Sequence, residues 1–314
     1  MKFTQQFYTR NFLILLAVIS LACSNADSKE KGHSGVDTDD FKNYWYAGEA
    51  EITRYQLEQA RYGEIRKGDA VLIFVTEDFL TDKQVKYEFG DSKNATSILK
   101  LNFVKKFYTG IYPYSMMTSV FTPVDMKKQS TLKVTTSSQE WCGHTFMQLN
   151  KRDDKYTVTV RSYFQSEGDK NFELKTVLLE DEIWTKIRIN PHSLPTGKFE
   201  IIPGSQFARL RHIPYKVEKA QAELQEITDK ALSEATIQMY SIDYENIERK
   251  LSIKFEKNFP HRILAWEESY PSGFGKNVKI LTTRAVKTHS IKSNYWARNK
   301  LSDSYLRDEL GLIY

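Results

Sequence analysis

The string Glu140-Trp141-Cys142-Gly143-His144 combines residue types that could do nucleophilic chemistry. If it forms part of a β-strand, Cys142 and His144 point to the same face, because side chains two positions apart share a face. An imidazole so placed could lower the pKa of the thiol and activate the sulfur. No third group to orient the imidazole lies nearby in the sequence. We therefore favour a buried free thiol beside a hydrogen-bonded histidine, and keep a thiol-dependent enzyme as the alternative.

Other catalytic patterns are missing from the sequence. No two of the six histidines are three to five positions apart, so we predict no metal site. Ser272-Gly273-Phe274-Gly275-Lys276 lacks the glycine spacing of a phosphate-binding loop and reads as an ordinary loop, and no Gly-x-Ser-x-Gly elbow occurs. Glu267 and Glu268 would face opposite sides of a strand, so we interpret both as solvated charges. We expect no cofactor.

Aromatic side chains are a second group of residues that could form a binding site, and the chain contains 18 Tyr, 18 Phe and 5 Trp. Several lie at alternating positions on or beside expected strands and could line a concave sheet that binds an apolar ligand. Packing in the core is the competing interpretation. The candidate ligand-binding residues are Tyr112, Tyr114, Trp141, Phe146, Trp266 and Tyr270.

The N-terminus has the anatomy of a secretory signal. A polar start with Lys2 and Arg10 precedes the apolar run 12–19, which is too short for the roughly 20 residues of a membrane-spanning helix. The junction Ser20-Leu21-Ala22-Cys23 resembles a bacterial lipoprotein signal. That resemblance implies a signal peptide over residues 1–22 and acylation of Cys23, which would anchor the protein to the cell envelope, in the outer membrane.

The chain after the expected signal peptide is nearly neutral. Removing residues 1–22 leaves 43 basic against 40 acidic residues, a net charge of +3, which gives no general reason to bind nucleic acid. Residues 23–41 are polar and without periodicity, as in a flexible tether. Residues 269–302 contain seven bases and no acid. Such a stretch either pairs with acids elsewhere in the fold or faces anionic lipid or polysaccharide.

The body, residues 42–314, is dominated by alternation with a period of two. Leu251, Ile253 and Phe255 alternate with polar residues, which predicts an antiparallel sheet with one buried and one wet face. The run 70–75 is apolar throughout and should lie in the middle of the sheet with both faces covered. We expect turns at 67–69 and 150–154. The predicted class is mostly β, with large curved antiparallel sheets or two facing half-barrels and one or two short helices.

Helix signals are few. Leu179, Ile183 and Ile187 have helical spacing and Asn190-Pro191 would end that helix; a second is expected near the C-terminus, from Ser302 to Gly311. Residues 217–232 fit a helix or a strand. Similar strings recur in the same order from 50 to 136 and from 222 to 283, which suggests two similar β-units, about 42–170 and 195–295, and favours a strand at 217–224.

Longer strings give a family resemblance. They include residues 45–52, 59–64, 109–115, 139–144, 182–191 and 194–197. With these, the chain resembles a family of Gram-negative envelope lipoproteins whose members often carry the label "septum formation inhibitor Maf". True Maf proteins are cytoplasmic nucleotide pyrophosphatases with a Ser-x-Ser-Pro-Arg-Arg motif, which this chain lacks. The resemblance therefore implies an envelope location and supplies no catalytic residues.

These observations lead to three hypotheses. The first is a lipid-anchored, non-enzymatic β protein that binds an apolar or amphipathic ligand, or an envelope partner protein, in a concavity of the sheet. The second is a thiol-dependent envelope enzyme that uses Cys142 and His144. The third is a surface binder of carbohydrate through exposed aromatics.

Overall fold

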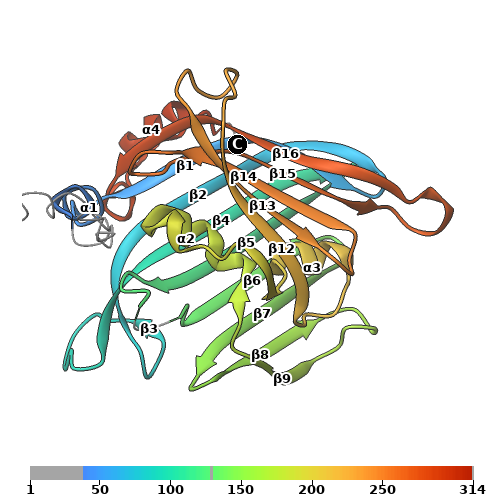
Figure 1. The fold of residues 1–314 in the computed structure, drawn as a ribbon, viewed down its shortest axis with the longest axis horizontal. Coiled ribbons are helices and arrows are strands. Elements are labelled where there is room, and N and C mark those ends of the chain that lie inside the picture. Colours follow the sequence, from blue (N-terminus) through green and yellow to red (C-terminus); the bar gives the residue numbers. More distant parts are fainter. Residues whose placement is uncertain (1–37, 128–129, 313–314) are drawn as a thin grey trace, which may run out of the picture. The chain divides into compact units, whose positions relative to one another are not determined.

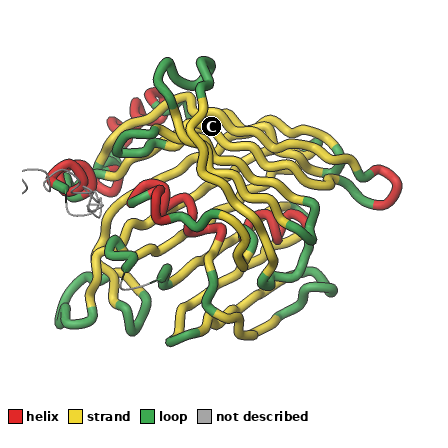
Figure 2. The backbone as a smooth tube through the Cα atoms, viewed as in Figure 1, coloured by secondary structure: helices red, strands yellow, loops and turns green. Residues whose placement is uncertain are grey.

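The computed structural model describes residues 38–127 and 130–312. Sixteen strands form one strongly curved sheet, and two short helices lie on its concave side (Figures 1 and 2). The predicted mostly β class with a large curved antiparallel sheet is confirmed. No helix in the described ranges is long and apolar enough to cross a membrane. The proposed signal peptide, the acylated Cys23 and most of the tether lie outside the described residues.

The sheet is an antiparallel meander with one exception, the parallel pairing of β10 with β11. Its order is β10-β11-β12-β13-β14-β15-β16-β1-β2-β4-β5-β6-β7-β8-β9, with β3 paired to β2. The first strand in sequence pairs with the last, β1 with β16, so both halves of the chain share one sheet. The edge strands β9 and β10 are not paired with each other within the described residues.

The strands of the first half are β1 (Ala50–Arg61), β2 (Glu64–Leu80), β3 (Val85–Lys86), β4 (Ala95–Thr109), β5 (Tyr112–Pro123), β6 (Lys133–Glu140), β7 (Gly143–Arg152), β8 (Lys155–Ser162) and β9 (Lys170–Lys175). Those of the second half are β10 (Leu178–Leu179), β11 (Gly197–Ile202), β12 (Glu218–Ile227), β13 (Ile237–Tyr244), β14 (Arg249–Glu256), β15 (Ile263–Ser272) and β16 (Lys279–Ser293). The ambiguous segment is thus a strand, β12.

The helices are α1 (Asp39–Trp45), α2 (Glu180–Ile189), α3 (Ser205–Arg211) and α4 (Tyr305–Glu309), with short 3₁₀ turns at Pro191–Ser193, Gly275–Asn277, Tyr295–Ala297 and Leu301–Ser304. The helix predicted around Ile183 is confirmed as α2; its last residue is Ile189, and the cap Asn190 precedes Pro191. The C-terminal helix is also present, although it begins as a 3₁₀ turn. Helices α1 and α3 had no clear sequence signal, because each is only seven residues long.

Helix α2 fills much of the concave side of the sheet. Ile183 and Ile187 are fully buried in a core that includes Leu101 of β4 and Ile253 of β14. Three acidic residues occupy its first turn, where the helix dipole favours negative charge. The interior concavity is therefore largely a packed core rather than an open ligand chamber.

Strand β2 behaves as its sequence predicts in the run 70–75. Leu72 and Phe74 face the main core, whereas Val71 and Val75 face a smaller cluster with Leu310 from the C-terminal segment. The turn expected at 67–69 is wrong, because β2 continues through Gly68. Gly68 lies so close to β4 that an added Cβ would stand 2.7 Å from the Cβ of Phe107. The glycine permits close strand contact there instead of a reversal.

The segments that looked repeated fall on two successive meanders. Those of the first series lie on β1, β2, β4 to β5 and β6, and those of the second lie on β12, β13, β14 to β15 and β16. These ten strands are contiguous in the sheet. Duplication of a β-unit stays a prediction.

Candidate functional site

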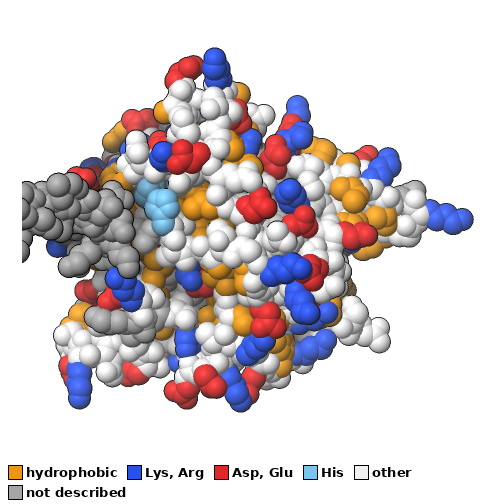
Figure 3. Space-filling view, in the orientation of Figure 1, with side chains coloured by type: hydrophobic (Ala, Val, Ile, Leu, Met, Phe, Trp, Pro, Cys, Tyr) orange, Lys and Arg blue, Asp and Glu red, His pale blue; other side chains and the backbone are white. Residues whose placement is uncertain are grey.

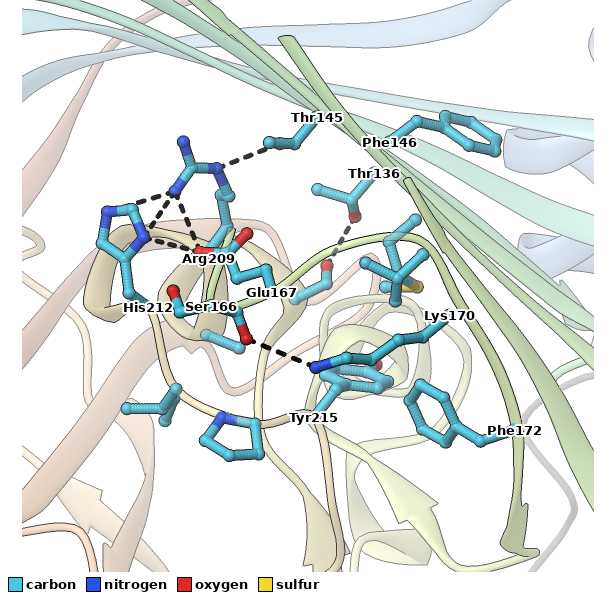
Figure 4. A pocket seen from close by; sticks show the side chains of 16 residues that line it. Thr136, Thr145, Phe146, Ser166, Glu167, Lys170, Phe172, Arg209, His212 and Tyr215 are labelled. Atoms are coloured by element: carbon cyan, nitrogen blue, oxygen red, sulfur yellow. Dashed lines mark hydrogen bonds and ion pairs between the residues drawn. The ribbon is translucent and has the colours of Figure 1, made fainter. Parts of the chain in front are cut away.

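A cavity of about 350 Å³ lies between the strands β6 to β8 and helix α3. The 162–170 connection and residues 212–215 complete its walls (Figure 4). Its apolar lining consists of Phe146, Met147, Val160, Phe172, Ala208, Ile213 and Pro214. Its polar lining consists of Thr136, Thr145, Ser166, Glu167, Lys170, Ser205, Arg209, His212 and Tyr215. We call this cavity the α3 pocket.

Charged groups gather on one wall of the α3 pocket. Nδ1 of His212 is 2.6 Å from Oε1 of Glu167, and the same oxygen is 3.7 Å from Nη1 of Arg209. Burial alone would raise the pKa of Glu167, but hydrogen bonds with His212 and Ser162, together with the charge of Arg209, lower it below its usual value. Glu167 is therefore a carboxylate that orients the two basic groups.

The guanidinium of Arg209 contacts several groups of the protein. Its Nε donates to Oγ1 of Thr145 at 3.0 Å, and its Nη1 contacts the ring of His212. Its Nη2 has no hydrogen-bond partner among the described residues and lies 3.7 Å from the carboxylate of Glu140. The side chain is only 9% exposed. Nη2 is itself closed off from solvent beside Glu140, so it belongs to that ion pair, and the pocket meets the rest of the Arg209 side chain.

The floor of the α3 pocket is a chain of hydroxyl groups that ends on a buried acid. Oγ of Ser205 is 2.6 Å from Oγ1 of Thr136 and donates to Oδ1 of Asp181 at 3.1 Å. Tyr215 donates to Oδ2 of Asp181 at 3.4 Å. Burial, with a smaller contribution from the charge of Glu180, raises the pKa of Asp181 to about 7 in spite of these hydrogen bonds. Asp181 therefore titrates near neutral pH behind the pocket.

Other buried charges fix α2 to the sheet. Arg188 forms a bidentate pair with Glu51, and Arg249 is held between Glu180 and Glu268. Our interpretation of Glu268 as a solvated charge is wrong, since it points inward at Arg249. Glu267 does face outward, where it pairs with Arg284 at 3.2 Å. Each of these carboxylates is paired with an arginine, so we interpret the pairs as contacts that hold the fold together.

The structure separates Cys142 from His144. Trp141 and Cys142 form the two-residue turn between β6 and β7, so Cys142 is not on a strand and the shared face does not exist. The predicted burial of the thiol is wrong as well, because Cys142 and His144 are both exposed. A hydrogen bond to Glu140 and the charge of that carboxylate raise the pKa of the Cys142 thiol, which opposes activation.

The six candidate aromatics have three different locations. Tyr114, Trp266 and Tyr270 are buried in the core, as the packing interpretation held. Tyr112 and Trp141 lie at hairpin ends, with their rings 6.2 Å apart. Phe146 alone among the six lines the α3 pocket.

Sequence reasoning missed the charged residues of the pocket. Arg209, His212 and Glu167 come from α3 and from a loop 45 positions away from His212, and no local motif joins them. A helix signal for α3 would have placed Arg209 and His212 together, but the helix is too short to produce one.

Searches of protein-family models, of curated proteins and of solved structures find no match to this chain. Within residues 38–127 and 130–312, no group of three or more His, Cys, Asp or Glu side chains is arranged to hold a metal ion.

Proposed function

We propose that this protein is a lipid-anchored, non-enzymatic component of the cell envelope that binds a small anionic amphipathic molecule in the α3 pocket. One observation carries the proposal: the pocket combines apolar side chains with the guanidinium of Arg209, which lines the cavity and is only 9% exposed. An apolar body would occupy the space beside Phe146 and Phe172, and an anionic group would accept from Arg209.

The size and the charge of the pocket support this ligand class. A volume of about 350 Å³ lies at the lower end of the usual range for small-molecule sites. Arg209 and Lys170 bring two positive charges to the lining and Glu167 brings one negative charge, before any charge on His212. A ligand with one acidic group and a short apolar chain or ring system matches both features.

The location of the protein is part of the proposal. Acylation at Cys23 would place the body at the outer membrane through two or more buried chains, which is the arrangement that gives stable anchoring. The resemblance to envelope lipoproteins supports the same location.

A thiol-dependent enzyme has less support. Cys142 has a raised thiol pKa, it stands in a turn, and it does not line the α3 pocket. His144 is exposed and has no described carboxylate or carbonyl partner to orient its ring. The pocket's own histidine, His212, contacts a carboxylate and a guanidinium, and it has no thiol or hydroxyl partner among the described residues that it could activate.

The test uses the chain from residue 24, which retains all of the described residues. Titration with an anilinonaphthalene sulfonate, a fluorescent anion with an apolar ring system, should show binding to one site. Arg209→Gln should weaken that binding about tenfold, as expected for a charged hydrogen bond. Arg284→Gln, which removes an exposed guanidinium far from the pocket, should leave it unchanged.

Two results would contradict the proposal. One is equal affinity of the Arg209→Gln variant and the parent for the sulfonate. The other is an unchanged affinity when Phe172→Ala removes part of the apolar wall. If neither of these results is found, the natural ligand can be sought. Incubation of the protein with membrane extract, followed by mass spectrometry of the molecules that copurify, should identify a carboxylate, sulfate or phosphate amphiphile.

A further inference from the structure

The strands end in turns along two opposite edges of the sheet, and one of these edges carries large apolar side chains at the ends of successive hairpins. In an antiparallel meander every second turn falls on the same edge. The β15–β16, β1–β2, β4–β5, β6–β7 and β8–β9 turns therefore share one edge. Its exposed apolar residues, from 57% to 79% accessible, are Tyr108, Ile111, Trp141, Tyr163 and Phe274. We call this set the aromatic rim.

Neighbouring turns of this edge are in contact. The ring of Tyr62 is 5.9 Å from that of Phe274, and its hydroxyl accepts from Tyr112 at 3.4 Å. Tyr112 in turn stacks on Trp141. The next turn joins the row because the ring of Tyr163 covers Gly143, where an added Cβ would lie 2.7 Å from that ring. The edge is thus a continuous apolar row that crosses five hairpins.

The β15–β16 hairpin extends beyond its neighbours, at the right of Figure 1, and hydrophobic side chains cover parts of it in Figure 3. Val278 and Ile280 add exposed aliphatic surface beside Phe274. Lys276 and Lys279 flank them and have no carboxylate partner among the described residues. No acid occurs between Glu268 and Asp303. The tip of the hairpin is therefore apolar and cationic.

The acids of the β1–β2 and β8–β9 turns have partners, whereas Glu245 and Glu248, in the β13–β14 turn at the same edge, are exposed. Glu64 pairs with Arg66, Glu167 with His212, and Asp169 lies 4.0 Å from Arg161. Along the five hairpins of the aromatic rim, the described charges without a partner of opposite sign are therefore cationic, and they include Lys276, Lys279 and Lys170.

From this surface we propose that the aromatic rim docks on a lipid bilayer that contains anionic lipid. Tyr and Trp rings are amphipathic and settle at the level of the head groups. Phe274, Val278 and Ile280 would enter the boundary with the acyl chains. Lys276 and Lys279 would extend to the anionic head groups, where each basic residue is attracted to the negative surface. This contact is additional to the proposed acyl anchor at Cys23 and does not depend on it.

A bilayer fits the aromatic rim better than a glycan does. A sugar stacks on a flat ring and needs hydrogen-bonding groups around it, whereas Ile111, Val278 and Ile280 offer none. The rim is a narrow row of hairpin ends, so it lacks the broad patch that a protein partner requires for a well-packed interface.

The test is flotation of the unlipidated chain, from residue 24, with vesicles. Vesicles of equal parts phosphatidylglycerol and phosphatidylcholine should carry the protein, and vesicles of phosphatidylcholine alone should carry much less. In about 1 M salt, where the Debye length falls to about 3 Å, the difference between the two should nearly vanish. The double variant Phe274→Ala/Ile280→Ala should bind about tenfold more weakly, as expected when apolar side chains are lost from the contact.

A matched control comes from the opposite edge of the sheet. Phe89, in the β3–β4 connection, is 85% exposed, so Phe89→Ala removes a large exposed apolar side chain from the opposite edge and should leave flotation unchanged. Equal loss with Phe89→Ala, or no flotation of the parent chain with either vesicle, overturns the proposal. So does competition by soluble envelope polysaccharide, which would make the rim a glycan site. Binding of the sulfonate probe in the α3 pocket tests the ligand-binding proposal separately.

Discussion

The guanidinium of Arg188, on α2, forms a bidentate pair with the carboxylate of Glu51, on β1, with Nη2 2.7 Å from Oε2. The two residues are 137 positions apart, and their side chains are almost completely buried. The desolvated pair also contacts aromatic surface, since the guanidinium lies 4.9 Å from the ring centroids of Trp45 and Phe74. This contact joins α2 to the strand at the seam between the two halves of the sheet.

Removing one member of this pair should destabilise the fold strongly. Glu51→Gln leaves the buried charge of Arg188 without its counterion, so the free energy of unfolding should fall by about 3 to 5 kcal/mol. Urea denaturation followed by circular dichroism measures this change. As a control, Glu173→Gln breaks an exposed pair with Lys155 and should cost less than about 1 kcal/mol. Similar losses for the two variants would contradict the importance of the buried pair.

Asp181 should make stability depend on pH. Its pKa rises from 3.8 to about 7 on folding. Between these values the unfolded chain releases this proton while the folded protein retains it, so the contribution of Asp181 to stability falls as pH rises and is level above about pH 7. Asp181→Asn removes the effect. The free energy of unfolding of the variant minus that of the parent should therefore be larger at pH 8 than at pH 4.

The comparison is a pair of urea titrations at the two pH values. Asp153→Asn serves as the control, since Asp153 is exposed in the β7–β8 turn. A difference between parent and Asp181→Asn that does not change with pH would show that folding does not raise the pKa of Asp181.

Cys142 should react slowly with an alkylating reagent at neutral pH in spite of its exposure. Only the thiolate reacts, and Glu140 raises the pKa of the thiol. Glu140→Gln should speed the reaction at pH 8. The rate of iodoacetamide modification as a function of pH measures both effects, with protein in urea as the reference. Fast modification of the parent below pH 7 would instead favour an activated thiol.

Gly68→Ala should destabilise the sheet by about 1 to 3 kcal/mol, the usual cost of overpacking. The new methyl group would stand 2.7 Å from the Cβ of Phe107, so β2 and β4 would have to move apart. Lys67→Ala, at the exposed neighbouring position, should change the unfolding free energy by less than about 0.5 kcal/mol. A tolerant Gly68→Ala variant would show that the two strands can separate without cost.

Local patterns predicted much of the secondary structure. The period-two alternation of Leu251, Ile253 and Phe255 gave a strand, and the four-residue spacing of Ile183 and Ile187 gave a helix, because each pattern puts apolar side chains on one face of a regular element. Gly68 was misread for a physical reason. A glycine between polar residues predicts a turn, whereas Gly68 allows strand β4 to approach closely. That contact is visible only when the position of β4 is known.

The candidate site was much less predictable. Cys142 and His144 drew attention because they are close in sequence, yet the turn at Trp141 and Cys142 separates the two side chains. Arg209 and Glu167 carried no signal, since a pocket is assembled from segments whose approach depends on the whole fold.

By itself the sequence determined a mostly β body, a helix at 180–189 and a central two-sided strand, since these follow from the periodicity of local burial. Tertiary structure decided that both halves of the chain share one sheet, that α2 fills its concave side, and that the α3 pocket lies beside it. It also decided which acids are buried: Glu268 and its neighbour Glu267 are the same residue type, but only the former meets Arg249. Burial of a charge depends on a partner brought from a distant strand, and that pairing is a property of the packed chain rather than of any local pattern.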